Sequence, residues 1–87
     1  MKTETLKVAS KSDAKAVAGA LLAIFQKGEK EVEINAIGAA AVNEAVKAVI
    51  IARGALVTQG KDVKIVPSFM DLEIDGIKKT GIRMLVG

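Results

Sequence analysis

Cysteine, histidine, tyrosine and tryptophan are all absent from this chain of 87 residues, and two phenylalanines are its only aromatic side chains. Without cysteine or histidine there can be no disulfide, no thiolate or imidazole metal site, and no Ser-His or Cys-His nucleophile pair. The core must be mainly aliphatic, with Phe25 and Phe69 expected as its only rings. A stacking platform for single-stranded bases is poorly supported.

Long apolar runs are also missing. No uncharged stretch approaches the roughly 18 residues of a membrane span, and no basic segment followed by an apolar run opens the chain. We therefore expect no membrane association and a cytoplasmic location. The length predicts one domain over residues 1–87, and 51% hydrophobic with 26% charged residues indicates a folded protein.

Hydrophobic periodicity predicts the element order β-α-β-α-β-β. The expected strands cover 4–9, 32–37, 62–74 and 77–86, and the expected helices cover 13–27 and 39–53. The first two strands should be parallel across a helical crossover, and Asp75-Gly76 predicts an antiparallel hairpin between the last two. Pro67 indicates an edge or a bend. The fold class is α+β, a two-layer arrangement with a four-stranded mixed sheet and two helices on one face.

Local signals place several boundaries. Ser12 is the expected N-cap of the first helix, and Gly54 the expected end of the second. Gly19, inside the first helix, costs roughly 1 kcal/mol of helix propensity relative to alanine, and close approach to another element would explain it. Gly81 is expected to form a bulge or kink in the last strand.

The second helix is apolar nearly all round, since only Asn43, Glu44 and Lys47 are polar between residues 39 and 52. Such a helix must be covered on more than one side, and in so small a chain the second cover is expected from another subunit. A homo-oligomer, dimer or higher, is therefore predicted. Gly38 enters this helix without a capping side chain, so its first N–H groups need water, a protein acceptor or an anion.

The net charge is +3, and residues 1–30 carry six lysines against three acids. This balance permits a polyanionic partner without requiring one.

Three stretches, IGAAAVNEAVKAVIIARG, LKVASKSDAKAVAGAL and VPSFMDLEIDG with TGIRMLV, closely resemble the stage V sporulation protein S (SpoVS) family. That family looks related to the Alba chromatin proteins, which share the β-α-β-α-β-β order. The resemblance implies an Alba-like dimer that binds DNA or RNA through a lysine in the first turn, a basic second turn and a mobile hairpin arm.

Carried over residue by residue, the resemblance implies nucleic-acid-binding positions in both turns and in the hairpin. These candidates are Lys11, Gly38, Ala39, Lys78, Lys79 and Arg83. Two features depart from the pattern. Ile37 and Ala39 stand where Alba proteins tend to place arginine, and the outgoing hairpin strand carries acids at 71, 73 and 75.

Each candidate also has a simpler interpretation. Lys11 could be an ordinary solvated lysine, and the small residues after Gly38 could serve tight packing, which we favour over phosphate contact. Lysines on an edge strand also prevent sheet-to-sheet aggregation. The acids of the hairpin resemble the start of a calcium loop. However, Ile82 occupies the twelfth position, where such a loop has glutamate, and the expected context is a hairpin and not a helix–loop–helix.

The leading hypothesis is a sporulation-associated, non-enzymatic regulatory protein that binds DNA or RNA mainly through phosphates. No catalytic residue, metal, cofactor or small-molecule substrate is predicted, because no constellation of acids, lysines and serines is recognisable. The alternative is a protein-interaction or structural module in a developmental pathway, without direct nucleic-acid binding.

Overall fold

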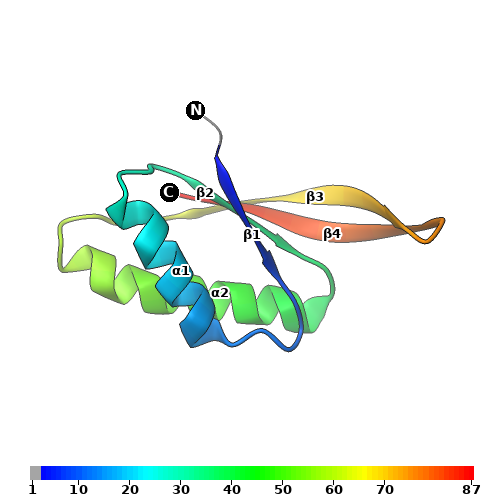
Figure 1. Ribbon diagram of the computed structural model, residues 1–87, viewed down its shortest axis with the longest axis horizontal. Coiled ribbons are helices and arrows are strands. Elements are labelled where there is room, and N and C mark those ends of the chain that lie inside the picture. The colour runs from blue at the N-terminus through cyan, green and yellow to red at the C-terminus, as the bar shows by residue number, and fades with distance from the viewer. Residues whose placement is uncertain (1–2) are drawn as a thin grey trace.

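The computed structural model describes residues 3–87, which form one four-stranded sheet and two helices. The elements are β1 (Glu4–Val8), α1 (Ala14–Gln26), β2 (Val32–Ala36), α2 (Ala39–Val57), β3 (Ile65–Ile74) and β4 (Ile77–Val86). The strand order is β1-β2-β4-β3, with β1 parallel to β2 and the other pairs antiparallel. Both helices lie on the same side of the sheet (Figure 1). The predicted two-layer α+β architecture is confirmed.

The β3–β4 hairpin extends well beyond the rest of the sheet. Its two strands pair without interruption from Ile65↔Val86 to Ile74↔Ile77, whereas β2 pairs only with Ile82–Val86. Residues 70–81 therefore form a two-stranded arm that projects away from the helices (Figure 1). At its tip Asp75 and Gly76 have φ angles of 52° and 76°, the conformation of the predicted two-residue turn.

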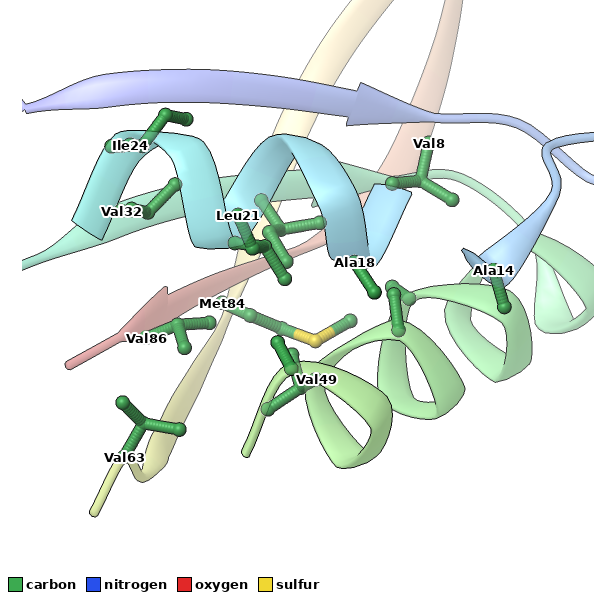
Figure 2. Close-up of a cluster of buried hydrophobic side chains, with 14 of the residues drawn as sticks. Val8, Ala14, Ala18, Leu21, Ile24, Val32, Val49, Val63, Met84 and Val86 are labelled. Carbon is green, nitrogen blue, oxygen red and sulfur yellow. The ribbon is translucent and has the colours of Figure 1, made fainter. Parts of the chain in front are cut away.

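The core lies between the helices and the near side of the sheet. α1 contributes side chains one helical turn apart, including Ala18, Leu21 and Phe25, all buried. Figure 2 shows Met84 of β4 among side chains from both helices. α1 packs on α2, and most of the buried residues of α2 are alanines, which let two helix axes come close.

α2 is longer than predicted, because it continues through Gly54 and ends at Val57. Leu56, expected in a connection, is 2% exposed and forms part of the core, which explains why the helix continues past a glycine. At its other end, Gly38 is the N-cap with φ 92° and makes no side-chain capping hydrogen bond, as expected. Within residues 3–87, neither helix combines the length and apolarity required to span a bilayer.

Two other expectations about element boundaries are wrong. Asp13, not Ser12, caps α1 by accepting a hydrogen bond from the Lys15 N–H at 3.1 Å. Ser12 instead closes the preceding turn, where its Oγ accepts from the Ala9 N–H at 2.9 Å. The third strand begins at Ile65 rather than Asp62.

Gly81 forms no bulge, since it lies in register opposite Met70. A Cβ atom there would lie 3.1 Å from both the Ala36 carbonyl oxygen and Ile37 Cγ1, so glycine permits β2 to end closely against β4. Gly19 has the opposite environment. A Cβ atom there would meet nothing within 4 Å, so close approach does not explain this glycine.

These two glycines predict opposite effects of the same substitution. Gly19→Ala should raise the free energy of unfolding by about 0.5–1 kcal/mol, because alanine restricts the unfolded chain and favours helix. Gly81→Ala should lower it by about 1–3 kcal/mol, because the added methyl group overpacks a close contact. Urea unfolding followed by circular dichroism measures both. A stabilising Gly81→Ala would contradict the close approach.

One ion pair joins the end of α2 to the segment before β3. Arg53 Nε donates to Asp62 Oδ1 at 2.6 Å, and Nη2 donates to Oδ2 at 3.5 Å. This hydrogen bond, more than the charge attraction, raises the pKa of Arg53. The same hydrogen bond is the largest cause that lowers the pKa of Asp62 below its ordinary value.

Removing the guanidinium should therefore return Asp62 toward its ordinary behaviour. In Arg53→Met the pKa of Asp62 is expected to rise, since the carboxylate loses its charged donor. An NMR titration of the carboxyl carbon measures this. Lys47→Met is the control, because Lys47 pairs with Glu44 and not with Asp62. An unchanged Asp62 pKa in Arg53→Met would refute the pairing.

Candidate nucleic-acid interface

The side of the sheet turned away from the helices, which we call the open face, carries most of the positive charge of the strands. Val32, Ile34 and Ala36 of β2 are buried against the helix layer, so Glu33 and Asn35 between them point to the open face. Cross-strand partners share a face. Lys7 of β1 and Arg83 of β4, both opposite Asn35, therefore lie on the open face as well.

The same alternation sorts the charges of the arm. Asp71, Glu73 and Lys78 are an even number of residues away from the core residues of their strands, so they lie on the helix side. Lys79 lies on the open face, opposite Leu72. Asp71 and Glu73 therefore point to the side of the arm opposite Lys79, although all three side chains border one shallow pocket of the arm. Glu33 is the acid that the strands contribute to the open face.

Lys11 lies in the turn between β1 and α1 and is exposed. β1 and β2 are parallel neighbours, so this turn and the one at Gly38 both leave the same edge of the sheet. The turn of Lys11 is held by the hydrogen bonds between Ser12 and Ala9. Lys11 is thus an exposed cation on an ordered turn, one residue before the hydrogen-bonding serine.

Gly38 and Ala39 have a different environment from the lysines. They line a groove of about 530 Å³ between the start of α2 and the hairpin, together with Val42, Phe69 and Ile82. The groove is mostly apolar and has no cationic side chain in its lining. This geometry agrees better with the packing interpretation of the small residues than with phosphate contact.

Phe69, expected in the core, is 78% exposed. It points to the helix side of the sheet, because it lies opposite Ile82, but the helices do not extend over it. Phe69 lines the groove together with exposed and half-buried apolar residues of α2. We call this the Phe69 surface, and it consists of Ala39, Val42, Val46, Ile50, Phe69 and Ile82. Ile50, one turn beyond Val46, is 63% exposed.

The predicted site residues therefore do not form one cluster. Lys79 and Arg83 share the open face, Lys78 lies on the opposite side of the arm, and Gly38 and Ala39 border the Phe69 surface. Sequence reasoning missed three residues with a potential role: Lys7 and Asn35 on the open face, and Phe69. Alternation along each strand indicated the side of the sheet for Lys7 and Asn35, but not that they lie beside each other, and it did not reveal the exposure of Phe69. Among residues 3–87, histidine, cysteine and acidic residues form no group of three that could hold a metal ion.

Comparison with known proteins gives two results. The family model described as Stage V sporulation protein S (SpoVS) matches residues 4–87. The solved structure of Alba from Thermoplasma volcanium superposes with a TM-score of 0.66 at 17% sequence identity, covering 95% of each chain. At this identity the similarity establishes an Alba-like fold and nothing about ligands.

Proposed function

Because the chain belongs to the stage V sporulation protein S family, we propose that it is a sporulation-associated regulatory protein that binds DNA or RNA. It acts without enzymatic chemistry, as a homo-oligomer, and contacts nucleic acid mainly through phosphates. The Alba-like fold supports this proposal. We assign nucleic-acid binding to the charged open face and assembly to the apolar Phe69 surface.

The observation that carries the proposal is the distribution of charge on the open face. Lys7, Lys79 and Arg83 extend from β1 across β4 into the arm, with Glu33 as the opposing charge of the strands. None of these three cations is in an ion pair, since the pairs within residues 3–87 are Lys47–Glu44 and Arg53–Asp62. Unpaired lysine and arginine on a sheet face provide sequence-independent phosphate contacts.

The turns supply the other proposed contacts. Lys11 is an exposed cation before a helix, where backbone donors and the helix dipole favour an anion. Gly38 and Ala39 are proposed only as positions where a phosphate could come close to the backbone N–H groups, because their groove is apolar. Lys78 is a weaker proposed contact, since it lies opposite Glu73, whose charge repels phosphate.

Assembly is proposed to use the Phe69 surface. Exposed apolar patches of this kind mark interaction sites, and a helix apolar nearly all round needs a second cover. A second copy of the chain fits this surface because a two-fold dimer requires a self-complementary patch. The groove lining carries no charged residue, so pairing it with its own copy brings no like charges together.

The nucleic-acid proposal predicts that charge reversals on the open face and first turn weaken binding in a salt-dependent way. Lys79→Glu and Lys11→Glu should each weaken binding to a labelled duplex or single-stranded RNA. They should also reduce the slope of log affinity against log salt by roughly 0.7–0.9 per lost contact. Fluorescence anisotropy at several salt concentrations measures both quantities.

Two comparison variants sharpen this experiment. Lys15→Glu makes the same charge change on the exposed side of α1 and should leave the slope unchanged. Lys78→Glu, next to Lys79 but on the other side of the arm, should have a smaller effect than Lys79→Glu. No binding at low salt, or equal losses in all four variants, would contradict phosphate contact by the open face.

The assembly proposal predicts that Phe69→Ser converts the oligomer to monomer. Burying one phenylalanine stabilises by about 1.5–3 kcal/mol, and a symmetric dimer loses two, so its dissociation constant should rise at least about 100-fold. Sedimentation or light scattering at micromolar concentration measures this. Val66→Ser is the matched control, because Val66 is 62% exposed on the same strand but faces the open side. A wild-type protein that is monomeric would rule the assembly out.

The alternative function is a protein-interaction module without nucleic-acid binding, and the Phe69 surface is the observation that favours it. The two functions separate clearly in Lys11→Glu and Lys79→Glu. If both variants keep the wild-type response to nucleic acid while Phe69→Ser changes assembly, the interaction module is the better description.

A further inference from the structure

Beside the arm lies a cavity that shares Lys7 with the proposed nucleic-acid surface but is otherwise not used by that proposal. It has a volume of about 500 Å³, within the range of small-molecule sites, and its walls are mainly aliphatic. Ile37, Met70 and Leu72 provide much of this apolar lining, and Lys7 and Asn35 are among its few polar residues. Apolar walls with a small number of polar groups are typical of ligand pockets.

Asn35 is the unusual polar residue of this cavity. Its Oδ1 atom is buried, with less than 1 Å² exposed, and accepts no hydrogen bond from any residue that the structure describes. A buried acceptor without a donor costs free energy, so such atoms in native proteins usually have a partner. A ligand with an N–H or O–H group could provide one, after small shifts of flexible wall residues such as Met70.

Two cations flank Asn35. Lys7 is its partner on β1 and Arg83 its partner on β4, which places their Cβ atoms about 5 Å from that of Asn35. Both side chains are exposed, and neither forms an ion pair within residues 3–87. Lys7 lines the cavity and so does Glu73, whereas Arg83 and Glu33 lie beside it without lining it. The Asn35 end of the cavity is therefore suited to an anionic group.

We infer that this cavity binds a small apolar carboxylic acid that carries an N–H or O–H donor beside its carboxylate. The carboxylate lies at Lys7, the adjacent donor reaches Asn35 Oδ1, and the aliphatic part contacts Ile37, Met70 and Leu72. α-Amino and α-hydroxy acids with branched side chains share this chemistry. The ligand is bound and not transformed, because the lining offers no recognisable catalytic constellation.

The test is an NMR titration of the full chain with three matched probes: leucine, 2-hydroxy-4-methylpentanoate and 4-methylpentanoate. The first two carry the donor as an amine or a hydroxyl, and the third lacks it. Saturable amide shifts are expected at millimolar concentration, confined to residues 7–10, 35–37 and 70–74. The probe without a donor should bind at least several-fold more weakly, because Asn35 Oδ1 stays unpaired.

Charge variants test the placement of the carboxylate. Lys7→Glu should weaken the better probe by about tenfold, because it replaces an attraction by a repulsion. Lys15→Glu, an equal change on α1, should have no effect. Both residues are exposed, and circular dichroism checks that each variant is folded.

Three results would overturn the inference. They are the absence of saturable shifts with every probe, shifts centred on the Phe69 surface, and equal affinity for the probe without a donor. The titration contains no nucleic acid, so its failure leaves the proposed function untouched, and failure of the nucleic-acid experiment leaves the cavity untouched.

Discussion

The uninterrupted pairing of β3 with β4 is the constraint on which the exposed surfaces depend. Side chains alternate strictly along paired strands, so the register assigns every residue of the hairpin to one face. A slip of β4 by one residue against β2 would move Lys79 and Arg83 to the helix side, and a slip of β3 by one residue against β4 would move Phe69 to the open face. The Asp75-Gly76 turn fixes this register at the tip, where both φ angles are positive. Gly81 preserves it at the base, where a bulge would otherwise relieve the contact with Ile37.

The parts of the fold that the sequence predicts are those with local causes. Element order follows from periodicity, the hairpin from Asp75-Gly76, and the edge position of β3 from Pro67. Phe69 shows why other features could not be predicted. Its parity points to the helix side, but its exposure depends on how far the helices reach along the hairpin. β1 and β2 are half as long as β3 and β4, so the helix layer ends before Phe69.

Helix ends show a related limit. Gly54 is an ordinary stop signal, yet α2 continues to Val57 because Leu56 reaches the core, and that burial outweighs the propensity of one exposed glycine. A similar competition determines which residue caps α1. Ser12 and Asp13 are both good capping residues, but Ser12 Oγ already accepts a hydrogen bond from the Ala9 N–H. Asp13 therefore accepts the capping hydrogen bond of the helix.

For the candidate site, sequence reasoning found the arm and both turns but not the surfaces. Lys78 and Lys79 are adjacent, so they cannot share a face of a strand, and this separation was available from alternation alone. The row of Lys7, Asn35 and Arg83 was not, because it joins three strands whose residues are far apart in the chain. Sites of this kind appear only when the register between non-consecutive strands is known.

The two surfaces lie on opposite sides of the same hairpin, and this relation gives the proposed assembly a function. Two copies joined through their Phe69 surfaces would keep both open faces accessible, because no open-face residue belongs to the apolar surface. A polyanion that contacts both faces binds the second at a high effective concentration, so assembly strengthens binding without adding a contact. Each copy alone offers few phosphate contacts. If two coupled copies contact the same polyanion, their combined contacts would be sufficient for binding even though the basic surface of each chain is small.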